Sequence, residues 1–434
     1  MDFKRYPFYK NSGVEWLGEI PEHWVGSKFK YIFQEKQHTK NMNLPFGAIS
    51  FGSVVYKEDK ANLTDELKEN YQEVLQGEFL VNPLNLNYDL KSLRTALSKI
   101  DVVVSSGYFV LKLKNNTFNK RYLEYLLYIF DIRKMKTLGA GIRQTLTFKD
   151  MAVCDVAIPS ACEQTQIASF LDSETSRIDN LIAKQEKLIE KLEEHRKSVI
   201  SHAVTKGLDP NAKMKDRGVE WLGEVPEHWE VRPLKYLGNC KNGINIGAEY
   251  FGSGSPFISY GDVYRNSELP TIFNGLVQST ENDKRIYSVQ RGDVLFTRTS
   301  ETIEEIGFSS TCLADVKDAT FAGFLIRFRP IKKSLLPEYS KYYFRNILLR
   351  SFFVKEMNLV TRASLSQELL KKLAVPLPSQ EEQSEIVSFL DSKTYRIDNL
   401  IEKQRKLIEK LKSYRTSIIS HAVTGKIDVR DLVA

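Results

Sequence analysis

The strongest constraint on this chain is that it contains the same two sequence blocks twice. The motif GVEWLGEIPEHW begins at Gly13 and recurs as GVEWLGEVPEHW at Gly218, with eleven of twelve positions identical. A longer block, residues 170–205, recurs at 389–424 with 27 of 36 positions identical. A period of 205 to 219 residues is too long for a solenoid unit and fits a pair of domains. The 434 residues therefore form two similar halves rather than one ordinary core.

The halves keep one part constant and let another part differ. The offset between them grows from 205 residues at the short motif to 219 at the longer block, which indicates loop insertions on a shared scaffold. Between the two blocks identity nearly vanishes while the apolar pattern persists. For example, AISFGSVV from Ala48 aligns with FISYGDVY from Phe257.

The longer block predicts a long amphipathic helix in each half. Its apolar residues follow a 3.5-residue spacing for about four heptads, and Ile182 and Ile189 widen the stripe. At 1.5 Å per residue the block makes a rod of roughly 54 Å. Because neither helix can bury its stripe alone, we expect the two to pack as an antiparallel coiled coil, with a glutamine in each fixing the register. The predicted seam residues are Ile178, Leu181, Gln185, Leu188, Leu192, Val199, Ile397, Leu400, Gln404, Leu407, Leu411 and Ile418.

Both predicted helices carry signals at their ends. Prolines stand just before each helix, and Ser160 or Ser379 is followed three residues later by Glu163 or Glu382, which is the capping-box spacing. A Lys-Gly or Gly-Lys pair closes each helix, as C-terminal glycines do. These closing glycines are Gly207 and Gly425.

The variable blocks, about 25–158 and 230–376, are predicted to be α+β. Their aromatic and branched residues gather in short β-rich stretches, with Gly, Asn and Ser between them. The predicted strands lie in 46–56, 101–113, 256–264, 293–298 and 320–330, and the predicted helices in 120–136 and 337–356. The predicted fold class is thus α+β, with two tandem domains in a pseudo-two-fold arrangement and two long helices between them.

Four successive regions follow from this pattern. The first domain covers 1–158 with its motif at 13–24, and the first helical region covers 159–206. The second domain covers 207–376 with its motif at 218–229, and the second helical region with a C-terminal tail covers 377–434.

Composition excludes several classes of protein. No run of about 18 apolar residues exists, so a membrane span is not expected, and the N-terminus lacks the apolar core of a signal peptide. Four distant cysteines without a CxxC pair argue against a disulfide framework or a zinc site. We therefore expect a cytoplasmic protein.

The net charge of +7 is unevenly distributed. The helical regions 163–205 and 381–424 carry −2 and +1, which leaves +8 on the rest of the chain. This is a modest attraction for phosphate, located on the variable domains and their flanks.

No catalytic motif is evident. The chain has no P-loop and no G-x-G-x-x-G after a strand. The segment Asn82-Pro83-Leu84-Asn85 resembles the Asn-Pro-Pro-aromatic motif of amino-methyltransferases but lacks the second proline and the aromatic ring. The repeated histidines His23 and His228, and all four tryptophans, are interpreted as structural anchors of the short motif, and no metal site is expected.

Together these motifs resemble the specificity subunit of type I restriction–modification systems. The two GVEWLGE motifs, the two helical blocks, NGINIGAEYFGSGSPFISYGDVY and GDVLFTRTS appear in the family's order, and the resemblance covers essentially the whole chain. The first half departs more: GEFLVNP stands where the second has GDVLFTR, and Cys162 precedes Glu163. This departure indicates that the first half reads a different DNA sequence.

The resemblance implies a non-catalytic subunit that reads an asymmetric, bipartite site in double-stranded DNA. Each variable domain would be a target-recognition domain, and the helices a spacer of fixed length. Two modification (methyltransferase) subunits and the restriction subunits would be the partners. S-adenosylmethionine, ATP and Mg²⁺ would bind to those partners, where base flipping would also occur.

Base-reading candidates follow from hydrogen-bonding chemistry, because Arg and Lys read guanine while Asn and Gln read adenine. Candidates lie in or beside loops after β-like stretches, and Arg298 is the best single candidate. The full set is Tyr56, Asn85, Asn87, Lys91, Arg94, Arg143 and Gln144 in the first domain, and Asn245, Tyr260, Arg265, Arg298, Thr299 and Arg362 in the second.

Two alternatives stay open from the residues. One is a coiled-coil scaffold or adaptor without nucleic-acid binding, which the helices alone would support. The other is a specificity subunit that serves a fused restriction–methylation enzyme.

Overall fold

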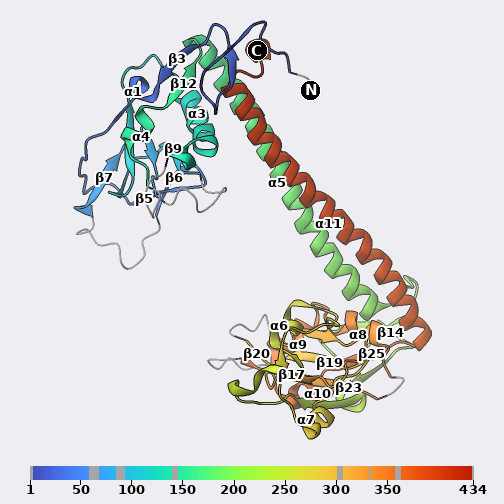
Figure 1. The fold of residues 1–434 in the computed structure, drawn as a ribbon. Coiled ribbons are helices and arrows are strands. Elements are labelled where there is room, and N and C mark those ends of the chain that lie inside the picture. Colours follow the sequence, from blue (N-terminus) through green and yellow to red (C-terminus); the bar gives the residue numbers. More distant parts are fainter. Residues whose placement is uncertain are drawn as a thin grey trace. The chain divides into compact units, whose positions relative to one another are not determined.

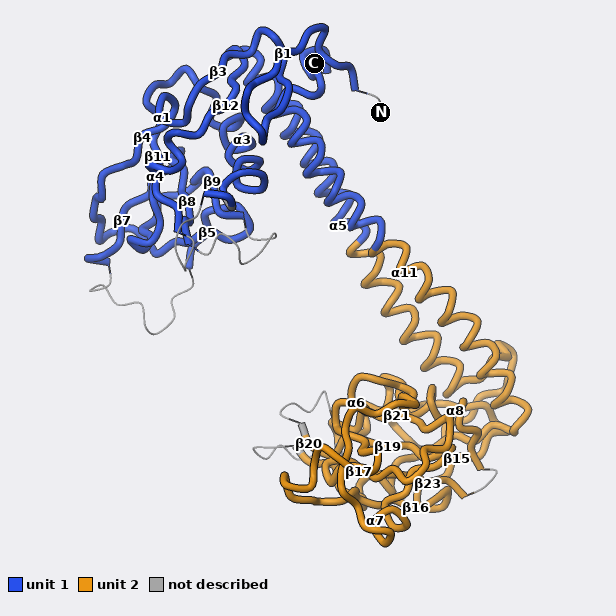
Figure 2. Tube along the Cα trace, viewed as in Figure 1, with its two compact units in different colours: residues 1–185, 406–434 blue, residues 186–405 orange. Residues whose placement is uncertain are grey.

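The computed structural model divides into two compact units. It describes residues 3–57, 68–84, 93–138, 145–300, 306–331, 334–356 and 363–432. Unit 1 comprises 1–185 and 406–434, and unit 2 comprises 186–405 (Figure 2). The two long helices, α5 (Ala161–Lys206) and α11 (Gln380–Val423), each contribute one end to each unit (Figure 1). The boundary between the units therefore crosses the helices instead of falling at their ends.

Unit 1 is built on a four-stranded antiparallel sheet of order β4-β11-β8-β9. Two-stranded pairs β1–β2, β3–β12, β5–β6 and β7–β10 surround it. The strands are β1 (Tyr9–Asn11), β2 (Glu19–Pro21), β3 (Val25–Lys28), β4 (Phe33–Glu35), β5 (Gly47–Ser50), β6 (Ser53–Tyr56), β7 (Tyr71–Val74), β8 (Phe79–Val81), β9 (Thr95–Leu97), β10 (Val102–Ser105), β11 (Phe109–Leu113) and β12 (Asp155–Ile158). The helices are α1 (Phe29–Ile32), α3 (Lys120–Arg133), η1 (Met135–Thr137), α4 (Phe148–Ala152) and η5 (Arg430–Leu432).

Unit 2 repeats this architecture with a sheet of order β16-β23-β19-β21. Its strands are β13 (Met214–Asp216), β14 (Glu224–Pro226), β15 (Glu230–Pro233), β16 (Gly238–Asn242), β17 (Phe251–Ile258), β18 (Leu276–Val277), β19 (Val294–Thr297), β20 (Thr299–Ser300), β21 (Ser309–Thr311), β22 (Thr320–Phe321), β23 (Leu325–Pro330), β24 (Ala363–Ser364) and β25 (Ala374–Leu377). Its helices are η2 (Leu234–Tyr236), η3 (Ala248–Tyr250), α6 (Tyr260–Arg265), α7 (Glu281–Ile286), α8 (Pro337–Tyr343), α9 (Leu349–Glu356) and α10 (Gln367–Lys371).

The two sheets correspond strand by strand. The buried strands β8 and β19 carry the aligned GEFLV and GDVLF segments, and each pairs with the strand that carries the aligned segment after Gly107 or Gly323. The predicted α+β fold with two long helices packed together is thus confirmed. None of the helices in the described parts of the chain is long and apolar enough to cross a bilayer.

Two predicted elements are wrong in detail. The strand predicted over 256–264 ends at Ile258, because Ser259 and Asp262 form a capping box that starts α6. The helix predicted over 337–356 is two helices. The Asn346 side chain donates to the Tyr343 carbonyl and accepts from the Leu348 N–H, and these local bonds replace helical ones between α8 and α9.

The helical seam follows a different edge from the one predicted. Leu188, Leu400 and Leu407 are exposed, whereas Ile401 and Ile408 are buried. Ile178, Ile397 and Ile418 are buried as the pattern requires, and Leu181, Gln185, Leu192, Val199, Gln404 and Leu411 are half-buried. In α11 a leucine lies three residues after Ile397 or Gln404, and an isoleucine lies four residues after it. Either set of residues keeps the 3.5-residue spacing of the seam. The packed helices use the isoleucine edge.

Equivalent ion pairs join the helices within each unit. Arg415 donates to both carboxylate oxygens of Asp179 in unit 1, at 2.9 and 3.2 Å. In unit 2, Arg196 donates to Asp398 in the same way, at 2.9 and 3.3 Å. The arginines and the aspartates are each 219 residues apart, so the pairs are copies of one contact. In one pair the first half of α5 contacts the second half of α11, and in the other pair the second half of α5 contacts the first half of α11. The two helices therefore run antiparallel, as predicted.

The repeated motif is anchored on the capping glutamate of a long helix. In unit 1 the Trp24 indole N–H donates to Glu163 Oε1 at 3.0 Å, and His23 Nε2 lies 2.9 Å from Glu163 Oε2. Tyr6 donates its hydroxyl to the same carboxylate at 2.6 Å. The histidine and tryptophan therefore act as structural anchors, as their repetition suggested.

Unit 2 contains the same anchor. The Trp229 indole N–H and His228 Nε2 lie 3.2 and 2.8 Å from Glu382 Oε1. The other oxygen, Oε2, accepts the Ser379 N–H at 3.2 Å, which completes the predicted capping box.

A glycine at the end of the opposite helix completes each anchor. Gly425, after α11, has φ +67°, and a Cβ there would overlap the Pro21 ring and lie 3.3 Å from Trp24. Gly207, after α5, has φ +78°, and a Cβ there would lie 3.2 Å from the Trp229 ring. Each anchor thus needs the start of one long helix and the end of the other.

We predict that Gly425→Ala destabilises unit 1 by about 1–3 kcal/mol, because it adds backbone strain and an overlap with Pro21. Gly13→Ala is the matched control, since Gly13 also has a positive φ (+68°) but a Cβ added there would meet no atom within 4 Å. Chemical denaturation should show a larger loss of unfolding free energy for Gly425→Ala than for Gly13→Ala. Equal losses for the two variants would contradict the role of Gly425 in the anchor.

A second prediction concerns acid stability. Burial raises the pKa of Glu382, but the hydrogen bonds from His228, Trp229 and the Ser379 backbone outweigh it, and the net pKa is lowered. A lowered carboxylate pKa contributes stability above the unfolded value, near 4.5, that is lost as the pH falls through the folded value.

Glu382→Gln should therefore lower the melting temperature at pH 7. The difference in melting temperature from the unmodified chain should shrink as the pH approaches 4. Glu385→Gln, an exposed change on the same helix turn, is the control. Scanning calorimetry across pH measures both, and a deficit of Glu382→Gln that does not depend on pH would contradict the charge-based anchor.

Candidate nucleic-acid interface

The body of each domain is fastened to its long helices by a repeated contact. Tyr125 of α3 donates its hydroxyl to Asp172 at 2.7 Å, and Tyr342 of α8 donates to Asp391 at 2.5 Å. The buried amide of Gln164 also holds the N–H of Asn119, at 2.9 Å, just before α3. These contacts fix the body of each domain on its long helices.

In unit 2, two predicted base readers lie on either side of one turn. The Asn245 side chain packs directly over Gly323, whose missing Cβ leaves room for it. The Arg298 N–H donates to the carbonyl of Phe324 at 2.9 Å. Phe324 itself is 61% exposed. Asn245, Arg298 and the exposed Phe324 thus meet at one turn beside the end of β19.

The other described candidates of unit 2 lie on neighbouring elements. Thr299 follows Arg298 and pairs with Ser364 in the short β20–β24 ladder. Tyr260 and Arg265 begin and end α6, where Tyr260 stacks on Tyr264 with ring centroids 5.8 Å apart. Helix α6 packs on β19 and β21, so it borders the same sheet.

In unit 1, the two described candidates differ sharply. Tyr56 ends β6 and is 59% exposed, which suits a reading residue. Arg94 is only 3% exposed, and its backbone N–H donates to the buried carboxylate of Asp131 at 2.6 Å. Arg94 is therefore an interior residue in this structure and does not reach a base edge. The prediction for Arg94 was made from the residue type, which does not show that the backbone at this position is held in the interior by Asp131.

Six further candidates lie outside the described residues. These are Asn85, Asn87, Lys91, Arg143, Gln144 and Arg362. Among the residues that are described, no three His, Cys, Asp or Glu side chains group so as to hold a metal ion.

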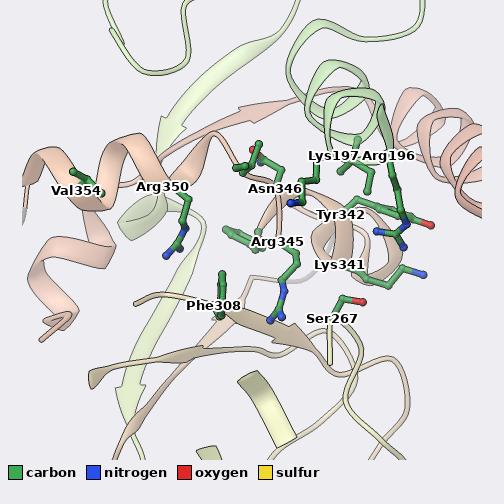
Figure 3. Close-up of a pocket in the computed structure, with 13 residues that line it drawn as sticks. Arg196, Lys197, Ser267, Phe308, Lys341, Tyr342, Arg345, Asn346, Arg350 and Val354 are labelled. Carbon is green, nitrogen blue, oxygen red and sulfur yellow. The ribbon is translucent and has the colours of Figure 1, made fainter. Parts of the chain in front are cut away.

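A cationic cavity of about 520 Å³ lies in unit 2, between the end of α5 and helices α8 and α9 (Figure 3). Figure 3 shows Arg196 and Lys197 entering from α5, and Arg345 and Arg350 pointing toward Phe308. Five of its lining side chains are cations and none is an acid, but Arg196 is paired with Asp398 and Lys341 lies 3.5 Å from Asp391. The positive charge of Lys197, Arg345 and Arg350 is the part that attracts phosphate.

The two inner arginines of the cavity are held by carbonyls and an aromatic ring. Arg345 donates to the carbonyls of Ser309 and Tyr264 at 2.8 and 2.7 Å and lies 4.6 Å from the Phe308 ring centroid. Burial lowers the pKa of Arg350 to about 10, and the charge of Arg345 acts in the same direction. Both guanidinium groups remain charged at neutral pH.

Unit 1 has a hydrogen bond at the equivalent position. The repeat alignment places Tyr128 where unit 2 has Arg345, and Thr416 where it has Lys197. The hydroxyls of Tyr128 and Thr416 lie 3.1 Å apart and join α3 to α11. The same scaffold therefore presents different chemistry in its two copies.

The residues that sequence reasoning missed are mostly aromatic. Phe324 and Phe51 are large, exposed rings in loops, and Phe308 is a cavity wall. The alignment of SFG at 50–52 with SYG at 259–261 is the signal that could have singled out Phe51. Hydrogen-bonding chemistry alone selects polar side chains and so passes over all three.

Comparisons with known proteins identify the family of the chain. A family model described as the type I restriction modification DNA specificity domain matches residues 31–194 and again 226–412. Because the two matches cover most of the chain, the protein belongs to this family, and it is a sequence-specific DNA-recognition subunit of the type I class. An adaptor without nucleic-acid binding is not favoured.

Two relatives match different shares of the chain. The MjaVIII specificity subunit of Methanocaldococcus jannaschii is 25% identical over 447 residues, covering 98% of each chain. The EcoKI specificity subunit of Escherichia coli K12 is 24% identical, covering 68% of this chain and 62% of its own.

Two solved chains share the fold. One, from a study of complex assembly and conformational transition of the type I R-M system, has a TM-score of 0.67 at 15% identity and covers 93% of this chain and 98% of its own. The HsdS subunit from Thermoanaerobacter tengcongensis has a TM-score of 0.53 at 15% identity and covers 94% of this chain and 98% of its own.

Proposed function

We propose that each unit reads one half of an asymmetric, bipartite site in double-stranded DNA. One observation carries this proposal: the two units share a sheet order and a set of anchors, yet they differ in the surfaces that project from them. Unit 2 has a cationic cavity where unit 1 has the Tyr128–Thr416 bond. A duplicated scaffold with unlike surfaces suits the reading of two unlike sequences.

Two kinds of contact are expected in unit 2. Asn245 and Arg298, beside the exposed Phe324, carry the donors and acceptors that read base edges. Lys197, at the rim of the cavity, is exposed and would contact backbone phosphate without reading sequence. Tyr56 is the described candidate for base reading in unit 1.

The long helices are proposed to bind two methyltransferase subunits. Leu188 and Leu407 occupy equivalent positions in the repeat, one in each helix, and both remain exposed beside the packed seam. Exposed apolar side chains on a charged helix suit a protein partner. Two equivalent faces support two copies of that partner, joined in the full assembly by restriction subunits.

Catalysis is proposed to reside in these partners, so the chain itself is non-catalytic. The methyltransferase subunits would bind S-adenosylmethionine and methylate adenine, and the restriction subunits would use ATP and Mg²⁺. The complex would act on DNA in the cytoplasm and would not need a membrane.

The binding test compares Arg298→Ala with Lys197→Ala in the chain assembled with its methyltransferase subunits. Arg298→Ala should weaken binding to the recognised duplex by about 1–3 kcal/mol and relax one position of the site. Lys197→Ala should weaken binding to all sequences alike and reduce the salt slope by about 1, because it removes a phosphate contact.

Fluorescence anisotropy at several salt concentrations, with the recognised duplex and a scrambled one, measures both effects. Lys187→Ala, an exposed lysine on the same helix but outside the cavity, is the control for lost charge. Absence of binding by the unmodified complex at low salt would contradict the proposed function itself. A uniform loss for Arg298→Ala would make that residue a phosphate contact instead of a base reader.

A further inference from the structure

Phe51 combines an unfavourable backbone with an almost fully exposed ring. It is the first tip residue of the hairpin formed by β5 and β6, its φ is +47°, and it is 88% exposed. Among the described non-glycine residues only Phe51 and Asp318 have positive φ. A bulky side chain in this conformation, with few contacts to hold it, needs an explanation outside the folding of the hairpin.

The turn itself does not call for phenylalanine. Phe51 and Gly52 both have positive φ, at +47° and +75°, which is the pattern of a two-residue turn that favours Asn-Gly. Asparagine adopts the left-handed conformation more readily than phenylalanine. A sequence selected for the turn alone would therefore place a small polar residue at position 51.

The hairpin below the ring is firmly packed. Val54 is buried in a cluster with Val74, Leu80 and Val102. A Cβ on Gly47 would lie 2.6 Å from Val102, and one on Gly52 would lie 2.7 Å from Leu93, so both glycines sit tightly against neighbouring side chains. The tip is thus a rigid support that holds Phe51 away from the unit.

The hairpin carries apolar and cationic residues behind its tip, toward its base. Tyr56 and Val55 are exposed on β6, and the exposed Lys57 follows them. At the base of the hairpin Lys68 lies over the Phe46 ring, 5.3 Å from its centroid. A narrow ribbon with an apolar tip and lysines behind it matches a DNA groove, where phosphates flank stacked bases.

The second half uses the aligned aromatic differently. Tyr260 aligns with Phe51, and Gly261 with Gly52, but there the chain enters α6. Tyr260 is half-buried and stacks on Tyr264. An exposed tip at this position is therefore particular to unit 1.

We propose that Phe51 is a wedge that inserts between two stacked base pairs in the half-site read by unit 1, with the exposed Lys57 near phosphates farther along the groove. The inference rests on the proposed DNA-reading function and assigns a wedge residue to it. Apolar side chains inserted in this way unstack one base step and make the sequence of that step energetically relevant. A protein partner is the weaker occupant, because a single ring at a narrow tip offers little area for a stable interface.

The test replaces Phe51 with asparagine in the chain assembled with its methyltransferase subunits. Phe51→Asn removes the ring but suits the turn, so the melting temperature should stay equal or rise. Phe8→Asn is the matched control, since Phe8 is also in unit 1 and 71% exposed, but it lies before β1. Phe51→Trp is the rescue variant, because it keeps a large apolar wedge.

The probe is a duplex that carries the site found by mapping methylated adenine in the host, with 2-aminopurine at successive adenines of each half-site. Unstacking raises 2-aminopurine fluorescence. The unmodified complex, Phe8→Asn and Phe51→Trp should brighten the same step in one half-site. Phe51→Asn should leave that step dark and bind roughly ten- to a hundredfold more weakly.

Each outcome separates the wedge from the broader function. Equal affinity and equal brightening for Phe51→Asn and the unmodified complex would overturn the wedge while leaving DNA reading intact. Failure of the unmodified complex to bind the duplex would instead overturn the proposed function. Loss of the methyltransferase subunits from Phe51→Asn would show that the ring contacts protein and would also overturn the wedge.

Discussion

Each unit depends on one carboxylate at the N-terminus of a long helix. Glu163 and Glu382 accept the indole N–H of the repeated motif, and the motif in turn packs against the glycine that ends the opposite helix. Since the helices are antiparallel, the start of one lies with the end of the other. Unit 1 therefore includes residues 406–434 from the far end of the sequence. This dependence explains why the blocks that recur almost unchanged are the motif and the helices.

A scaffold held in this way leaves the outward surfaces free to differ. In unit 2, Arg345 and Lys197 line a cavity, whereas the aligned Tyr128 and Thr416 of unit 1 form a hydrogen bond. The ion pair between the long helices next to this position is the same in both units. Neither replacement disturbs the sheet or the anchors. Divergence on a fixed support is what a DNA-reading protein needs, because new specificity can arise without a new fold.

Much of the fold follows from local signals in the sequence, and the rest depends on tertiary contacts. The long helices begin and end near the predicted residues, because proline, the serine–glutamate caps and the closing glycines act locally. The choice of Ile401 over Leu400 for the seam depends on how the helices lie together, and both residues satisfy the same period. The burial of Arg94 against Asp131 joins segments far apart in sequence, so no local pattern announces it. The aligned SFG and SYG segments mark Phe51 in the sequence, but its exposure and its positive φ appear only in the structure.

If one duplicated scaffold carries two independent reading surfaces, either surface should work in either unit. The most direct test maps methylated adenine genome-wide in a host whose chain has the variable block 29–154 replaced by its counterpart 234–373. We expect an abundant methylated motif in which both halves carry the same bases, namely those of the half-site read by unit 2. A motif unchanged from that of the unmodified chain, with both halves still different, would contradict it.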